Sequence, residues 1–305
     1  MVTQIRKAWK SAANIGCALV MLALPFSPAR GDAISDWNAI AARMAASSEH
    51  PRAAQELAAV HAAMFEAMNF VEGKYVPRFL VKQPAPLGAS GEVEAIGAAH
   101  YALAQLYPEQ KAALDAALEH SLAAFPDWDA TSRARIWGRH LGGNVYGLLA
   151  PERPSSGANV PSAGNSKLSR LRTSPGESGT GGETWNSIAT RSIEGRTLQP
   201  IERARIHALV SLAASNVYST AGDAKAGYGP NVPCVSCAVG AAIRVILEAE
   251  FGATAEIGAA NERVPGRAYL MPVRNDADES RSAKAGEELG RKIGLQTLTY
   301  YRRIK

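Results

Sequence analysis

The stretch Pro233-Cys234-Val235-Ser236-Cys237-Ala238 runs directly into the small and apolar segment Val239-Gly240-Ala241-Ala242-Ile243-Arg244-Val245. A proline-led turn before such a run predicts the start of a helix. The first N–H groups of a helix have no partner inside it, so they attract an anion or a thiolate. We therefore expect a helix from about Cys234 to Phe251, with Gly252 as its stop.

Two cysteines lie at this predicted helix start. Cys234 and Cys237 are the only cysteines after Cys17, which falls in an N-terminal apolar run. In an oxidising compartment such a pair favours a structural disulfide. The same placement also suits a redox-active pair, because a helix start lowers the pKa of the first thiol. A shared metal site is a third interpretation, although two cysteines make an incomplete zinc site.

The N-terminus has the pattern of a secretory signal over residues 1–33. Basic residues precede the apolar run Ala12–Leu24, which is too short for a comfortable membrane span. An uncleaved anchor is the alternative. We expect a periplasmic or secreted protein with no membrane span after signal removal. Four of the 33 basic residues lie in residues 1–31, which leaves 29 basic against 28 acidic residues and no case for a nucleic-acid partner.

The remainder predicts an all-α bundle in one domain. Apolar residues recur at three- and four-residue spacing, strand-like alternation is absent, and 47% of residues are hydrophobic. The halves 34–150 and 184–305 should pack together around a flexible Ser/Gly/Pro-rich insert, 151–183. His61 is expected to be packed or hydrogen-bonded. Asp129 is expected to cap a helix whose inner face carries Ile136, His140, Gly143 and Gly147.

Several short segments together resemble the bacterial vanadium-dependent haloperoxidase-like family, part of the type-2 phosphatidic acid phosphatase superfamily. The order of the segments along the chain carries the resemblance. It implies the helical bundle of that family and, because relatives often form dimers, a homodimer. The segments are Asp36-Trp37-Asn38, Val60–Asn69, Ala98-Ala99-His100, Leu106-Tyr107-Pro108, Trp185-Asn186, Ile206–Leu212, Asp223-Ala224-Lys225 and Leu289–Gly294.

That family holds vanadate or phosphate through a lysine followed by Arg-Pro, a Pro-Ser-Gly-His turn, and a late Ser-Arg segment that leads to a second histidine. Lys225 matches the lysine, without the Arg-Pro, and Pro233 matches the proline of the turn. Ser236 stands at the histidine position of that turn, and Arg281 lies in the segment that resembles the third motif. Histidine does not occur after His207.

The leader predicts export, and the missing histidines predict a catalytically degenerate relative that acts as a binding or scaffold protein. Serine cannot replace an imidazole in proton transfer near neutral pH. One alternative is a vanadium-dependent haloperoxidase or acid phosphatase that holds an oxyanion at the helix start with Lys225, Ser236 and Arg281. The other alternative is thiol–disulfide exchange at Cys234 and Cys237. We expect no cofactor, or vanadate if the family activity survives. The sequence does not identify the partner.

Overall fold

The computed structural model describes residues 32–48, 50–81, 85, 87–125, 127–151, 185–224, 233–253 and 276–304. Of the predicted leader, 1–33, residues 1–31 lie outside the described residues, and so do residues 152–183 of the predicted insert, 151–183. The described residues belong to one compact unit, Asp32–Lys305.

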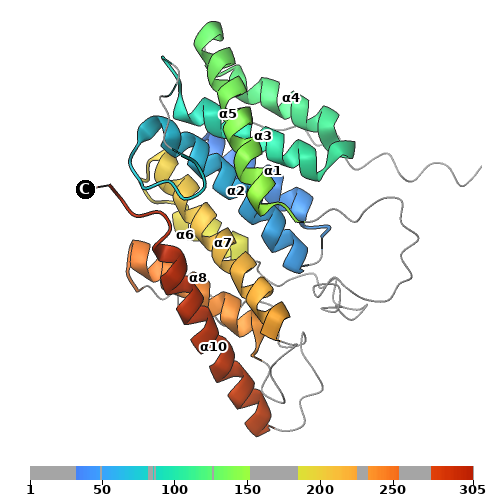
Figure 1. Cartoon of the computed structure of the whole chain (residues 1–305), viewed down its shortest axis with the longest axis vertical. Coiled ribbons are helices and arrows are strands. Elements are labelled where there is room, and N and C mark those ends of the chain that lie inside the picture. The colour runs from blue at the N-terminus through green and yellow to red at the C-terminus, as the bar shows by residue number, and fades with distance from the viewer. Residues whose placement is uncertain are drawn as a thin grey trace, which may run out of the picture. The chain divides into compact units, whose positions relative to one another are not determined.

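The described residues form an all-α structure, as the sequence predicts (Figure 1). Within these ranges the structure has nine α-helices and one 3-10 turn and no β-strand. No helix in the described part of the chain is long and apolar enough to cross a bilayer. The helices are α1 (Ala33–Ala45), α2 (His50–Glu72), α3 (Gly91–Leu106), α4 (Lys111–Leu122), α5 (Trp128–Leu149), α6 (Trp185–Ile193), α7 (Pro200–Ala224), α8 (Val235–Phe251) and α10 (Asp276–Leu298), with the 3-10 turn at Pro108–Gln110.

The cap of α5 corrects one prediction from the sequence. Asp127, not Asp129, precedes the helix with extended backbone, and its carboxylate accepts a hydrogen bond of 3.0 Å from the N–H of Ala130. Asp129 already lies in the first turn, where a negative charge favours the helix dipole instead. The sequence pattern did not distinguish the two positions because both aspartates flank Trp128.

The buried face of α5 also differs from the prediction. Ile136 is 57% exposed, and the buried residues of α5 include Gly138, Leu141 and Gly142. A Cβ atom on Gly138 would lie 2.1 Å from the carbonyl oxygen of Glu94 in α3. The close approach of two helix backbones therefore decides which face of α5 turns inward, and apolar spacing alone did not show it.

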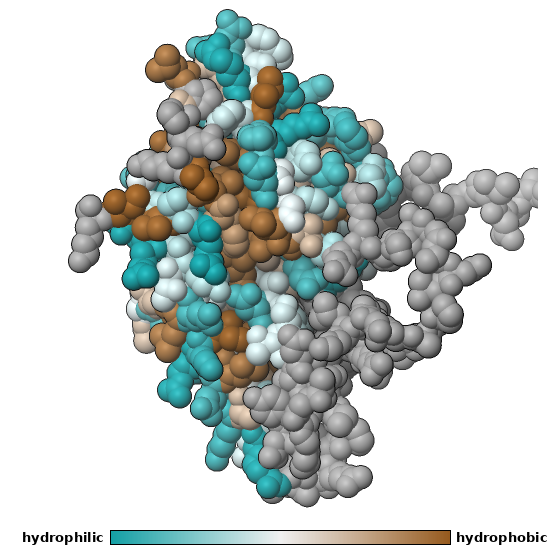
Figure 2. All heavy atoms as spheres, viewed as in Figure 1, coloured by the Kyte–Doolittle hydropathy of each residue, from teal (hydrophilic) through white to brown (hydrophobic). Residues whose placement is uncertain are grey.

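The core lies around α2 and α7, which pack against each other (Figure 1). Nearly every described side chain of α2 from Ala54 to Asn69 is buried, and many are alanine. Small side chains let the helices approach closely, and Trp37, Phe65 and Leu209 fill the remaining space. The outer face shown in Figure 2 mixes hydrophobic and hydrophilic residues.

The last helix, α10, packs against α8 through a regular series of glycines. A Cβ on Gly286 would lie 2.3 Å from the carbonyl oxygen of Cys234, and one on Gly290 would lie 2.0 Å from that of Ala238. Gly294 continues the series against Ala242 at 2.8 Å. Because the glycines are four residues apart, they lie on one face of α10, and this face packs against α8. The packing brings the N-terminal part of α10 to the start of α8.

Candidate functional site

The start of α8 forms as the sequence predicts. Cys234 has the extended backbone of an N-cap, and its Sγ accepts a hydrogen bond of 3.2 Å from the N–H of Cys237. Gly252, with a φ of 79°, ends the helix in the left-handed region that glycine adopts without steric cost. The predicted boundaries of this helix are therefore confirmed.

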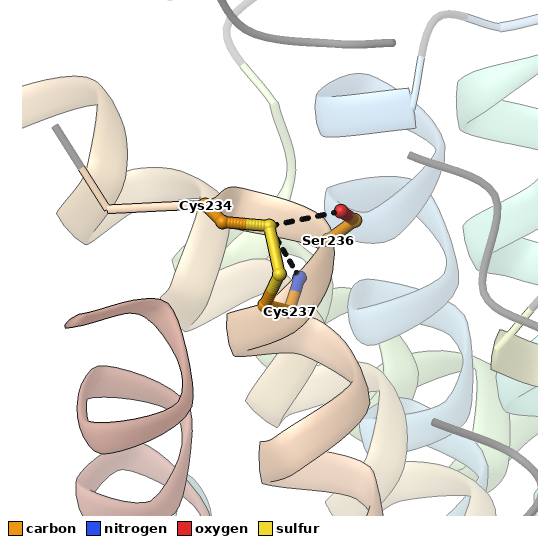
Figure 3. Close-up of a disulfide and its surroundings, with 3 residues drawn as sticks. All are labelled: Cys234, Ser236 and Cys237. Atoms are coloured by element: carbon orange, nitrogen blue, oxygen red, sulfur yellow. Dashed lines mark hydrogen bonds between the residues drawn. A yellow bond between two sulfur atoms is a disulfide. The ribbon is translucent and has the colours of Figure 1, made fainter. Parts of the chain in front are cut away.

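Cys234 and Cys237 form a disulfide whose Cα atoms lie 5.3 Å apart (Figure 3). Both residues are half-buried, and the Oγ of Ser236 lies 3.3 Å from the Sγ of Cys234. The disulfide removes both thiolates, so the oxidised pair is neither a nucleophile nor a pair of metal ligands. We call Cys234, Ser236, Cys237 and Ser282 the helix-start site.

The helix-start site already uses part of its own hydrogen-bonding capacity. The N–H of Cys234 donates to the carbonyl oxygen of Ser282 in α10 at 3.0 Å. The N–H of Cys237 donates to the Sγ of Cys234. Because an oxyanion at a helix start is held by such backbone donors, these two internal bonds reduce what the site offers to an anion.

The structure brings two of the three sequence motifs together. Ser282, the residue after Arg281, contacts the backbone of Cys234, so the late segment does meet the cysteine turn. Arg281 has an exposed side chain in the N-terminal part of α10. Lys225 lies outside the described residues. The proposed grouping of Lys225, Ser236 and Arg281 therefore stays a prediction.

A second polar group lies inside the bundle, and sequence reasoning did not find it. Residues of α1, α2 and α7 line a closely packed pocket that has no room for a water molecule. Its lining residues are Ile34, Asn38, His61, Met64, Ala204 and His207. We call this space the histidine cavity.

Two histidine rings from different helices face each other at this cavity. The rings of His61 in α2 and His207 in α7 have centroids 5.2 Å apart, and the residues are only 1% and 3% exposed. Burial, reinforced by the neighbouring His207, lowers the pKa of His61 well below its ordinary value. Burial also lowers the pKa of His207 to about 4. Both imidazoles are therefore neutral near neutral pH.

A hydrogen-bond chain determines which nitrogen of His61 carries the proton. The hydroxyl of Ser211 donates to the carbonyl oxygen of His207 at 2.8 Å, and Ser211 Oγ also lies 2.6 Å from His61 Nδ1. Serine has a single hydroxyl proton, so His61 donates from Nδ1 and keeps a lone pair on Nε2. The prediction that His61 is packed or hydrogen-bonded is confirmed.

Two buried ring nitrogens at the cavity have no hydrogen-bond partner among the described residues. They are Nε2 of His61 and Nδ1 of His207. Buried polar atoms in folded proteins are nearly always hydrogen-bonded or coordinated, so these two exceptions call for a partner, and the pocket is too small for a water. The sequence signal was present, because His61 and His207 both lie on alanine-rich helix faces, but single-helix patterns do not show that two helices meet there.

Comparison with family models, with curated proteins and with solved structures found no match to this chain.

Proposed function

We propose that this protein is an exported, catalytically degenerate relative of the haloperoxidase-like family that acts as a binding or scaffold protein. The observation that carries the proposal is the helix-start site itself. Ser236 stands where the resemblance requires a histidine, and a disulfide and Ser282 occupy backbone donors that an oxyanion would use. The chain therefore lacks both the imidazole and the complete set of anion-binding donors that the chemistry of that family requires.

Exposed hydrophobic residues near the start of α5 support a binding role. Trp128 is 77% exposed and Leu87 is 94% exposed. The two lie on neighbouring segments, because a Cβ on Gly88 would be 3.8 Å from the Cβ of Ala130. Large exposed apolar side chains that gather in one region are typical of interaction surfaces, and tryptophan is enriched among the residues that dominate binding energy.

Titration of the purified protein with orthovanadate tests the loss of catalysis. We expect the heat of injection to match dilution into buffer, and no bromide oxidation with peroxide and no phosphate-ester hydrolysis above background. An active vanadium haloperoxidase assayed in parallel serves as the positive control. Saturable binding that disappears in Lys225→Ala, or turnover in either assay, would contradict the proposal and favour the oxyanion-using enzyme.

Thiol–disulfide exchange is a second candidate, and one observation favours it. The N–H of Cys237 donates to Cys234 Sγ, and the Ser236 hydroxyl lies beside that sulfur. After reduction, both donors would stabilise a thiolate on Cys234. In the exchange, a dithiol partner attacks the disulfide through a mixed disulfide, loses two electrons and two protons, and leaves oxidised while Cys234 and Cys237 become thiols.

Equilibration with glutathione buffers separates the two candidates. A structural disulfide should stay oxidised across mixtures of reduced and oxidised glutathione in which a redox pair is half reduced. Alkylation followed by mass spectrometry reads the fraction of reduced Cys234. Partial reduction of the pair within the glutathione range would favour the redox candidate over the scaffold. The Ser236→Ala variant should then show no such reduction, because it destabilises the Cys234 thiolate.

A further inference from the structure

The histidine cavity offers three soft or borderline ligand atoms in a small space. His61 and Met64 lie three residues apart on α2, which places them on one face of that helix. His207 reaches the same cavity from α7. Met64 is 1% exposed, so its thioether is as buried as the two imidazoles.

We propose that the histidine cavity binds one Cu(I) ion through His61, Met64 and His207. The site is separate from the helix-start site and does not depend on the function proposed above. The described part of the chain gathers no three His, Cys, Asp or Glu side chains around a metal position. The third ligand is therefore a thioether, which selects soft cations such as Cu(I).

The charge of the cavity favours a monovalent cation. Its lining includes no carboxylate and no thiolate. The two charged groups that act on His207, Asp32 and Arg203, are opposite in sign and form an ion pair, so they supply little net charge to balance a bound ion. The solvation free energy that an ion loses on burial rises with the square of its charge, so Zn²⁺ or Cu²⁺ costs about four times as much to bury as Cu(I). Zn²⁺ also binds most often in four-ligand sites with anionic cysteine or carboxylate ligands.

The hydrogen bonds around His61 orient it as a ligand. Its Nδ1–H donates to Ser211, which leaves Nε2 deprotonated and without a hydrogen-bond partner among the described residues. Metal-bound histidines are typically held in this way, with the second ring nitrogen donating to an outer acceptor.

Anaerobic titration with Cu(I) tests the proposal. The full-length chain carries Cys17→Ser and keeps the Cys234–Cys237 disulfide, so that no free thiol competes; a thiol assay verifies this. Cu(I) is supplied as its acetonitrile complex against a chromogenic chelator. Since His61 and His207 are almost fully buried, Cu(I) is added to the folded chain and, in a second arm, during refolding. We expect one equivalent per chain and X-ray absorption with two nitrogen ligands and one sulfur ligand.

Paired variants locate the ion. Met64→Leu should weaken binding by about tenfold or more and remove the sulfur scatterer, while Met68→Leu, one turn later on the same buried helix, should leave both unchanged. Ser211→Ala should weaken binding by about 10–100-fold through the orientation of His61. Circular dichroism verifies that each variant is folded.

Two results overturn the proposal. The first is that neither arm retains one equivalent of Cu(I) in the parent chain, which would leave the two ring nitrogens as buried polar atoms without a ligand. The second is that Met64→Leu and Met68→Leu bind Cu(I) equally well, which would place the ion elsewhere.

Discussion

Glu94 shows how burial changes the chemistry of a single residue. Its side chain is fully buried in α3, and neither carboxylate oxygen has a hydrogen-bond partner among the described residues. Burial raises the pKa of Glu94 from an ordinary 4.5 to about 8. The folded chain therefore holds a proton on Glu94 at neutral pH, whereas the unfolded chain releases it.

This raised pKa predicts a pH-dependent gain in stability for Glu94→Gln. Below pH 4.5 Glu94 is protonated in both the folded and the unfolded parent chain, so its ionisation does not lower the stability. As the pH rises toward 8, ionisation stabilises only the unfolded state, so by pH 8 the parent loses about 4 kcal/mol relative to the variant. Urea unfolding at pH 5 and pH 8 measures the difference. Glu119→Gln, at an exposed position of α4, should show no such trend.

The glycine face of α10 shows how an element depends on residues with no side chain. Backbone contact between α8 and α10 requires Gly290, because a Cβ there would lie 2.0 Å from the carbonyl oxygen of Ala238. The same contact holds Ser282 against the helix-start site. Any substitution that separates the two helices should therefore also disturb the surroundings of the disulfide.

We predict that Gly290→Ala destabilises the protein by about 1–3 kcal/mol, because the added methyl overpacks a backbone contact. Gly147→Ala in α5 is the matched control, since a Cβ there meets nothing within 4 Å. That control should be neutral or should stabilise by about 0.5–1 kcal/mol, because alanine favours a helix over glycine. Urea midpoints measure both effects. Equal changes in the two variants would contradict the backbone-contact explanation.

At the scale of the whole molecule, the C-terminal residues close the bundle against its first half. Tyr301 is fully buried, and its ring lies 4.2 Å from that of Phe65 in α2. Its carbonyl oxygen accepts a hydrogen bond of 2.9 Å from Arg205 in α7. An isolated antiparallel bridge pairs Tyr75 with Arg303, so the end of the chain is tied to the segment that follows α2.

Ending the chain after Tyr300 should lower stability by about 3–5 kcal/mol, because it removes a fully buried aromatic side chain. Ending it after Arg303 keeps Tyr301 and should cost much less, since it removes mainly the hydrogen bond from Ile304 to Lys74. Thermal unfolding of the two truncated chains and the full chain measures the difference. A similar loss in both would show that Ile304 and its hydrogen bond to Lys74, not Tyr301, hold the terminus.

The fold class and the start of α8 could be predicted from the sequence because both depend on local rules. Apolar spacing, proline and glycine determine where helices begin and end, and they identified Cys234 and Gly252 as the limits of α8. The disulfide also followed from two cysteines three residues apart in a chain with a predicted secretory leader. These features need only neighbours along the chain.

Only the tertiary structure decided which residues meet across the bundle. The buried face of α5, the contact of Ser282 with Cys234 and the pairing of His61 with His207 each depend on the packing of separate helices. Helical periodicity shows that a face is buried but not which helix covers it. For that reason the sequence by itself determined an all-α chain with a disulfide at a helix start, and tertiary packing created the histidine cavity.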